Sequence, residues 1–313
     1  MDVFVFIHEA DLHANLHPHR TELCFNYAEK LTADKVEFSV GGNAANTAVS
    51  FARLGFESQL YSMVGDDNLG EQIRSVLETE KVVCRYIQTY KGQTSYTTAL
   101  IFQGERTLLI YHVPHNYQLP SFQPVDWLYL TSMGKAYRTA YDKVLTFVKK
   151  HKIKVSFNPG TFQLRSGVTS LKPFLTVTEV LFVNREEAQM LAELPASTSV
   201  RHLAEAVYDL GPSIVVITDG PKGSYCFDGE QLLFCDIFPI EVAERTGAGD
   251  SYASGFTAAL LNGEPLDEAI RWGMANSAGV VSKVGPEAGL LTKSQMQEML
   301  NDFAKIRPKA VRR

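Results

Sequence analysis

The 313-residue sequence lacks several features that would assign a protein to a class at once. Lysine and arginine (30) do not outnumber aspartate and glutamate (35), and the resulting net charge of −5 argues against a nucleic-acid-binding protein. No apolar run approaches the roughly 20 residues of a membrane span, and the amino end MDVFVFIHEAD has no basic region of the kind that begins a signal peptide. The four cysteines form no CxxC pair, so no disulfide framework is expected. These absences predict a cytoplasmic protein that acts on a small molecule or on another protein.

Apolar, strand-like runs alternate with helical patterns over most of the chain. Runs such as VLFV (180–183) and IVVIT (214–218) are apolar throughout, as expected for strands that helices cover on both faces. Strand followed by helix, repeated, predicts an α/β fold with a doubly wound, mostly parallel sheet. The helices are expected at 43–54, 70–80, 140–151, 186–194, 200–210, 250–262, 265–283 and 293–303.

An antiparallel pattern interrupts this scheme early in the chain. Residues 84–113 contain two adjacent alternating runs joined by the turn-like Gln103-Gly104-Glu105, and residues 34–40 add a short strand. No linker rich in proline or serine separates two independent domains. We therefore expect a single domain, residues 1–313, with a small β lid formed by about 3–7, 34–40 and 84–113 and placed where it can cover a site.

The strongest local signal is the segment ERTGAGDS at 244–251, directly before a helical pattern. Its small residues allow a tight turn, after which the N–H groups of Gly247, Ala248 and Gly249 can bind an anion at the start of the helix. Asp250 suits a base that takes a proton from a hydroxyl group while those N–H groups stabilise a transferring phosphoryl group. An N-cap aspartate after a glycine turn is the alternative interpretation.

A second glycine motif, GGNAAN at 41–46, opens another predicted helix. Gly41 and Gly42 permit close approach of the backbone to a ligand, and Asn43 and Asn46 lie one turn apart and can bond to hydroxyl groups. The segment matches neither the dinucleotide fingerprint G-x-G-x-x-G nor the P-loop G-x-x-x-x-G-K-[ST]. A helix cap explains the same residues without a ligand.

Two further segments follow predicted parallel strands, at the carboxyl ends where open α/β sheets bind ligands. Asn184 and Glu187 are three residues apart and could hold a hydrated Mg²⁺ near phosphates, although a helix capping box is a strong alternative. The turn TDGPKGS at 218–224 could admit a nucleotide, and an ordinary β-turn explains it equally well.

Together these segments resemble the PfkB (ribokinase-like) family of sugar and nucleoside kinases. GGNAANTAVSFARLG is similar to the first signature of that family and ERTGAGDSYASGF to the second, with VGDDNLGEQI, the GERT turn, NREE and ITDGPKGS in the family's order. The resemblance covers about residues 36–284. It implies a ribokinase-like fold and an ATP-dependent phosphotransferase that acts on a hydroxyl group of a small, fructose- or ribose-like sugar. A nucleoside (adenosine-type) kinase and a catalytically silent sugar- or nucleotide-binding homologue are the alternatives.

The resemblance also implies roles for individual residues. The catalytic group comprises the general base Asp250 and the anion hole of Gly247, Ala248 and Gly249. The substrate contacts implied are Asp2, Gly42 and Asn46. The residues implied to lie along ATP are Thr218, Gly220, Gly223, Asn276 and Val280. The residues implied to position Mg²⁺ are Asn184 and Glu187.

The chain departs from the family pattern in two places. Glu244-Arg245 stands where the family usually has Asp-Thr or Asp-Ser, which leaves potassium binding by this loop in doubt. Family members begin with a buried strand, a glycine and a substrate-binding aspartate, but no glycine precedes Gly41 here. Either Val3–Ile7 is that strand and Asp11 the contact, or the chain starts one strand late with Asp2 as the contact. DVFVF favours Asp2, which implies a missing central strand.

The resemblance has one implication for assembly. Lid strands in this family often pair between subunits, so a homodimer formed through the lid is an expectation as well.

Overall fold

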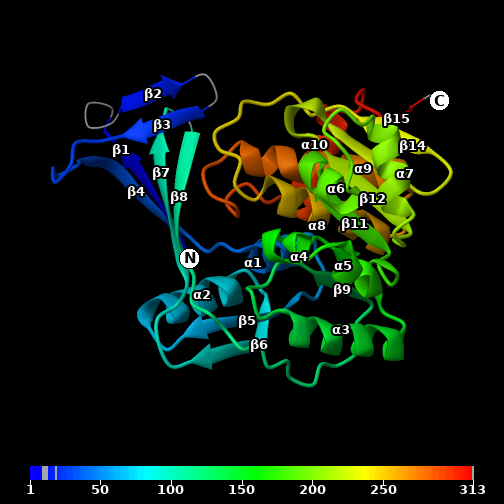
Figure 1. Ribbon diagram of the computed structural model, residues 1–313, viewed down its shortest axis with the longest axis horizontal. Coiled ribbons are helices and arrows are strands. Elements are labelled where there is room, and N and C mark those ends of the chain that lie inside the picture. Colours follow the sequence, from blue (N-terminus) through cyan, green and yellow to red (C-terminus); the bar gives the residue numbers. More distant parts are fainter. Residues whose placement is uncertain (9–12, 18–19, 104, 312–313) are drawn as a thin grey trace.

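The computed structural model describes residues 1–8, 13–17, 20–103 and 105–311 (Figure 1). Asp11 lies outside these residues. The strands are β1 (Asp2–Ile7), β2 (His13–His17), β3 (Arg20–Cys24), β4 (Ala33–Ser39), β5 (Gln59–Gly65), β6 (Val83–Tyr90), β7 (Tyr96–Phe102), β8 (Glu105–Tyr111), β9 (Trp127–Leu130), β10 (Lys154–Phe157), β11 (Val180–Asn184), β12 (Ile214–Thr218), β13 (Ser224–Phe227), β14 (Leu232–Cys235) and β15 (Lys309–Ala310). The helices are α1 (Asn43–Arg53), α2 (Asn68–Thr79), α3 (Arg138–His151), α4 (Thr161–Arg165), α5 (Val168–Leu175), α6 (Arg185–Ala192), α7 (Val200–Tyr208), α8 (Ala248–Leu261), α9 (Leu266–Val281) and α10 (Lys293–Asp302).

A seven-stranded sheet in the order β15-β14-β13-β12-β11-β10-β9 is the centre of the fold. β9, β10, β11 and β12 are parallel, whereas β13, β14 and β15 continue the sheet in antiparallel fashion. The parallel strands arise from the expected strand–helix repeats, because each connection returns the chain to the same end of the sheet. Their carboxyl ends therefore lie along one edge.

Helices cover both faces of this sheet, which explains the continuous apolar strands. Leu181 and Val183 of β11 face a core formed with α3, α5, α6 and α7, while Val180 and Phe182 face a second core formed with α8, α9 and α10. The same alternation occurs in β12. Strands buried on both faces cannot show the polar alternation of half-exposed sheets.

β5 and β6 form a separate parallel pair. Together with α1 and α2 they enclose a third, smaller core that includes Val49, Leu60, Val64 and Leu77. α2 begins at its N-cap Asp67, whose side chain accepts a hydrogen bond from the Gly70 N–H group, as short polar side chains do at helix starts.

A four-stranded sheet in the order β4-β1-β7-β8, called the small sheet below, extends away from the helices (Figure 1). The sequence predicts residues 84–113 as part of one antiparallel unit, and the structure divides this segment. β7 and β8 are antiparallel partners within the small sheet, whereas β6 pairs in parallel with β5. Alternating apolar residues predict a strand but do not specify its partner, which accounts for the difference.

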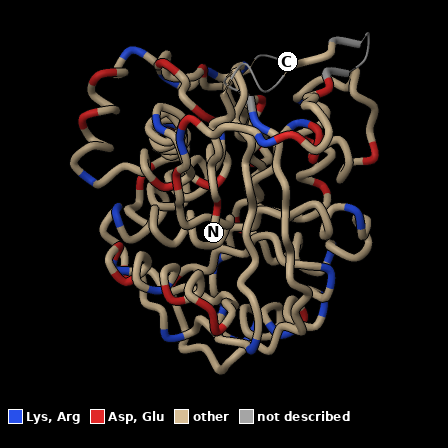
Figure 2. The backbone as a smooth tube through the Cα atoms, turned by 90° about the vertical axis from the view of Figure 1, so that its left-hand side faces the viewer, with Lys and Arg blue, Asp and Glu red and all other residues tan. Residues whose placement is uncertain are grey.

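Several short elements are absent from the sequence-based expectations. They include the β2–β3 hairpin and the helices α4 and α5, which follow β10 where no helix was predicted. α4 and α5 have only five and eight residues, too few for a clear helical period. In the part of the chain that the structure describes, no helix has the length and apolarity needed to cross a membrane. On the face shown in Figure 2, acidic and basic residues are interspersed.

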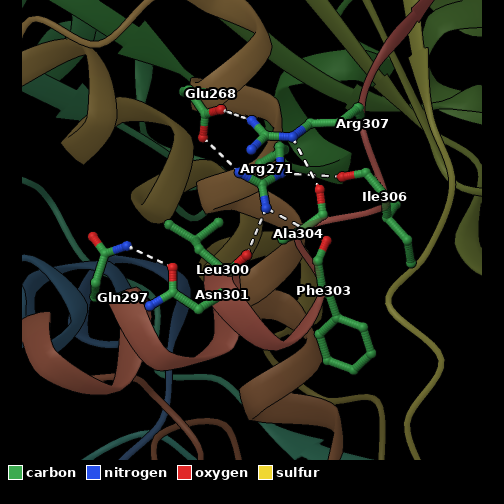
Figure 3. Close-up of polar contacts among 9 residues, drawn as sticks. All are labelled: Glu268, Arg271, Gln297, Leu300, Asn301, Phe303, Ala304, Ile306 and Arg307. Carbon is green, nitrogen blue, oxygen red and sulfur yellow. Dashed lines mark hydrogen bonds and ion pairs between the residues drawn. The ribbon is translucent and has the colours of Figure 1, made fainter.

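A buried arginine joins α9 to the end of α10 (Figure 3). Arg271 is 3% exposed and donates hydrogen bonds to the carbonyl oxygens of Leu300 (2.7 Å) and Ile306 (3.1 Å) and to the Glu268 carboxylate (2.8 Å). Carbonyl groups at the end of a helix have no partner within it, so the guanidinium group stabilises them. Arg307, on the surface, binds the other oxygen of Glu268.

We predict that Arg271→Met lowers the free energy of unfolding by about 3 kcal/mol, because buried carbonyl oxygens lose their donors. Arg307→Met is the matched control: Arg307 is 52% exposed, and its loss costs less than about 1 kcal/mol. Urea unfolding of the two variants measures the difference. Equal losses would contradict the role assigned to Arg271.

Candidate functional site

Two cavities meet at Asn43, where α1 begins. The larger, about 890 Å³, is lined in part by Asp2, Gly41 and Gly42. The smaller, about 210 Å³, lies at the carboxyl ends of the parallel strands and is lined by Asn158, Phe182, Val183, Asn184, Glu187, Thr218, Arg245, Gly247, Ala248, Gly249, Asp250 and Tyr252. The structure thus brings residues 184, 187, 218 and 247–250 together in the smaller cavity, although they are far apart in the sequence, and residues 41–43 line the adjoining larger one.

The glycine turn at 247–249 begins α8. Gly247 has φ +79°, and a Cβ atom there would approach Pro286 to 2.8 Å, so this position requires glycine. The N–H group of Ala248 donates to the Arg245 carbonyl oxygen at 3.3 Å and is therefore engaged within the turn. A Cβ atom on Gly249 would meet no atom within 4 Å, which leaves open space beside the start of the helix. The positive end of the α8 dipole faces this space.

Asp250 lies in the first turn of α8 and is 7% exposed. Its Oδ2 atom accepts a hydrogen bond of 2.8 Å from the Asn46 side-chain amide of α1. Burial raises the pKa of Asp250 to about 6, while the bond from Asn46 lowers this pKa and the nearby charge of Asp2 raises it. The group is therefore a carboxylate at neutral pH, with a proton affinity higher than that of an ordinary aspartate.

Asn46 has an unused hydrogen-bonding atom at the same place. Its Nδ2 atom donates to Asp250, whereas its buried Oδ1 atom has no hydrogen-bond partner among the residues that the structure describes. Buried polar atoms without partners are rare in folded proteins and commonly mark the position of a water or a ligand. Asn46 Oδ1 can accept a hydrogen bond from a hydroxyl group beside Asp250.

Asp2, at the start of β1, lies at the wall of the larger cavity. A Cβ atom on Gly41 would come within 2.0 Å of Asp2 Oδ2, so only glycine leaves room for this carboxylate. Burial raises the pKa of Asp2, and the amino group of Met1 opposes this shift. Gly42 has φ +106° and turns the chain into α1.

The small sheet contacts the loop before α8 through one ion pair. Arg106 of β8 donates to Glu244 Oε1, and Glu244 is 6% exposed. The same oxygen accepts hydrogen bonds from the N–H and hydroxyl groups of Thr246, at 2.8 and 2.5 Å. The departure from the family pattern at Glu244 is thereby explained structurally: the carboxylate has a cationic partner within the chain.

Asn184 and Glu187 form a complete capping box at the start of α6. Asn184 Oδ1 accepts from the Glu187 N–H group and Glu187 Oε2 accepts from the Asn184 N–H group, each at 2.9 Å. Both residues also line the smaller cavity. Burial raises the pKa of Glu187. Because amide and carboxylate oxygens are the donors that Mg²⁺ prefers, the pair fits a hydrated magnesium ion as well as a helix cap.

The residues expected along ATP fall into two groups. Thr218, at the end of β12, lines the smaller cavity, and Gly220 and Gly223 form the turn directly after it. A Cβ atom on Gly223 would approach the Cys235 carbonyl oxygen to 2.3 Å, so this glycine permits close packing of the chain.

Asn276 and Val280 of α9, the other two residues expected along ATP, line neither cavity, and their contact with the nucleotide stays a prediction. Both are fully buried. The Asn276 amide donates to Ser50 Oγ (2.9 Å) and to the Ser251 carbonyl oxygen (2.8 Å), and its oxygen accepts from the Leu291 N–H group (3.1 Å). This buried network joins α9 to α1 and α8, so Asn276 positions the helices that carry Asn46 and Asp250. Val280 packs in the core around α1.

Two residues near the site were not singled out from the sequence as site residues. Asn158 lines the smaller cavity and donates to the Phe182 carbonyl oxygen at 2.8 Å. Asn158 directly follows the parallel strand β10, so the rule that pointed to Asn184, at the carboxyl end of such a strand, also applies to it. Arg106 gave no such signal, because its pairing with Glu244 joins positions 138 residues apart.

A model of the pfkB family of carbohydrate kinases matches residues 13–293. The chain belongs to the pfkB family. A ribokinase of Haemophilus influenzae is 26% identical over 285 residues, which cover 87% of this chain and 90% of the relative. An ATP-dependent 6-phosphofructokinase of Thermoanaerobacterium thermosaccharolyticum is 23% identical over 298 residues, covering 90% and 91%. The structure of Arabidopsis thaliana ribokinase with ribose and ATP superposes with a TM-score of 0.77 at 21% identity, covering 96% and 95% of the two chains.

These findings confirm two expectations from the sequence. The fold is the ribokinase-like α/β fold, and the chain is an ATP-dependent sugar kinase. The names of these two relatives state different sugars, so membership of the pfkB family does not identify the substrate.

Proposed function

We propose that this protein transfers the γ-phosphoryl group of ATP to a hydroxyl group of a small, uncharged sugar, with Asp250 as the general base. The observation that carries this proposal is the buried Asp250 carboxylate, which lines the smaller cavity and accepts a hydrogen bond from Asn46, one helical turn from the Asn43 that lines both cavities. The larger cavity has room for the sugar and the smaller one for the phosphate groups. The small sheet is the lid that covers the sugar.

Asp250 takes the proton of the attacking hydroxyl group as the oxygen–phosphorus bond forms. A pKa of about 6 keeps Asp250 ionised at pH 7 and makes it a stronger base than an exposed aspartate. Asn46 Oδ1 accepts a hydrogen bond from the sugar, and Asp2 and Gly42 contact its other hydroxyl groups. The start of α8 stabilises the charge on the phosphoryl oxygens through the N–H groups of Gly247 and Gly249 and the positive end of its dipole, with Ala248 holding the turn through its bond to Arg245.

Asn184 and Glu187 would hold the magnesium ion through its water shell, and Thr218, Gly220 and Gly223 would lie along the nucleotide. Bound magnesium supplies neutralisation of the phosphate charge during transfer. Potassium activation is not part of this proposal. The guanidinium group of Arg106 lies beside the Glu244 carboxylate and supplies a positive charge there. This pairing supports the proposal that the enzyme works without potassium.

The lack of lysine and arginine side chains in the lining of the larger cavity supports an uncharged substrate. Among the described residues that line the larger cavity, none is lysine or arginine, whereas Asp2, Glu57 and Asp126 are acidic. A sugar phosphate or sugar acid needs cationic or N–H partners when it is taken out of water. Arg106, the nearby cation on β8, is already bound to Glu244.

We predict that an ADP-release assay with a panel of acceptors gives turnover with a neutral hexose or pentose, such as fructose or ribose, and none with the corresponding sugar phosphates. A specificity constant for fructose 6-phosphate above that for every neutral sugar would contradict the uncharged-substrate proposal. Preferential turnover of adenosine would identify a nucleoside kinase instead.

The same assay tests the role of Asp250 with the variant Asp250→Asn. The amide keeps the size and a hydrogen-bonding oxygen but cannot take a proton, so kcat falls roughly 10²–10⁴-fold while ATP binding, measured by calorimetry, is retained. Unchanged turnover would remove Asp250 from the mechanism.

We also propose that the protein forms a homodimer through the small sheet. Its edge strands β4 and β8 expose apolar side chains, among them Phe38 (66% exposed) and Leu109 (56% exposed). Clustered exposed apolar residues commonly mark a protein–protein contact.

Sedimentation velocity tests the dimer. We predict that the wild-type chain sediments as a dimer and that Phe38→Lys shifts it towards the monomer, because the charge would be buried at the contact. Val76→Lys, at an exposed apolar position of α2, leaves the dimer intact. A wild-type monomer at micromolar concentration would contradict the proposal.

A further inference from the structure

Arg245 belongs to the segment 244–251, and the proposed mechanism gives its side chain no role. The residue lines the smaller cavity together with Asp250 and the glycine turn at 247–249. Among the described residues that line this cavity, Arg245 is the only lysine or arginine. This cation thus lies where the phosphate groups are proposed to bind.

The guanidinium group of Arg245 is free to bind a ligand. In the parts of the chain that the structure describes, Arg245 makes no ion pair and no side-chain hydrogen bond. Arg106, by contrast, is already bound to Glu244. Arg185, the first residue of α6, is bound to Asp219 at 3.0 Å. Of these three arginines, Arg245 alone keeps all of its N–H donors for water or a ligand.

The backbone on both sides of Arg245 is held in place. Before it, Glu244 Oε1 accepts hydrogen bonds from Arg106 and from the N–H group of Thr246, the latter at 2.8 Å. After it, the N–H group of Ala248 donates to the carbonyl oxygen of Arg245 at 3.3 Å. Arg245 itself is exposed. A fixed backbone with a free side chain can place its charge on a ligand without rearrangement of the loop.

The charges around the smaller cavity favour a cation at this position. Its acidic lining residues, among those described, are Glu187 and Asp250, and both repel a phosphate group. The start of α8 supplies only about half of a positive charge. A guanidinium group adds a full charge to that of the magnesium ion proposed at Asn184 and Glu187, and it binds phosphate oxygens through two parallel hydrogen bonds.

We propose that Arg245 is a further catalytic residue, whose guanidinium group donates hydrogen bonds to the phosphoryl group while it is transferred. This inference rests on the proposed function. The sugar oxygen forms a bond to the γ-phosphorus, the bond from this phosphorus to the β–γ bridging oxygen breaks, and its electron pair leaves with ADP. The hydroxyl proton goes to Asp250. Arg245 keeps all of its protons and stabilises the negative charge of the reacting oxygens.

The test compares Arg245→Met with Arg165→Met in the ADP-release assay. Arg165, at the end of α4, is exposed, lines neither cavity and makes no ion pair within the described residues, so it is a matched control. We expect Arg245→Met to lower kcat at least roughly 10²-fold, because a transition-state contact is lost, with the KM for the sugar unchanged. Arg245→Lys recovers part of this loss, since lysine keeps the charge but not the paired donors. Arg165→Met keeps the wild-type kcat.

A second measurement separates catalysis from nucleotide binding and from folding. Calorimetry measures the binding of ADP alone and of ADP with aluminium fluoride, magnesium and the sugar, a mixture that imitates the phosphoryl group in transfer. Arg245→Met is expected to bind ADP as the wild type does and the mixture at least about tenfold more weakly. Urea unfolding of this variant matches that of the wild type, because Arg245 is exposed.

The outcomes for Arg245 and for the proposed function are distinguishable. Wild-type kcat in Arg245→Met, in an enzyme that Asp250→Asn inactivates, would overturn this proposal and leave the proposed function intact. An equal loss of ADP affinity and of kcat would also overturn it, since Arg245 would then serve nucleotide binding alone. A wild type that releases no ADP with any sugar would contradict the proposed function itself, and this inference with it.

Discussion

The hydrogen bond between Asn46 and Asp250 is the contact on which the site depends. It joins α1 to α8 across 204 residues of sequence and gives a buried carboxylate a side-chain donor. A buried carboxylate without a donor would take up a proton at neutral pH and could no longer act as a base. The bond therefore fixes both the position and the ionisation of Asp250.

Hydrogen bonds in the surrounding core hold α1 and α8 in a fixed position relative to each other. Ser254 of α8 donates to Ser50 of α1 at 2.7 Å, and Asn276 of α9 binds both Ser50 and the backbone of α8. Asn46 Oδ1, by contrast, is buried and has no hydrogen-bond partner among the described residues. Such a rigid surrounding is what general-base catalysis needs, because the base must keep its distance from the reacting hydroxyl group.

Local patterns in the sequence predicted the helices and the glycine turns well, and pairings between distant residues poorly. The glycine at 247 and the capping box at Asn184 and Glu187 depend on neighbours within a few residues, so their chemistry can be read directly. The burial of Asn276, the partner of Arg106 and the pairing of β6 depend on how distant segments meet. The helix cap at Asn184 and Glu187 does not exclude the proposed magnesium site, because both residues also line the smaller cavity.

The pH dependence of kcat/KM, compared between the wild type and Asn46→Leu, tests the account most directly. Activity requires the carboxylate form of Asp250, so the wild-type profile falls as the pH decreases through about 6. Leucine removes the donor that lowers this pKa, so the acid limb moves to higher pH in the variant. An acid limb that stays in place, or moves to lower pH, would contradict the claim that Asn46 maintains Asp250 as the base.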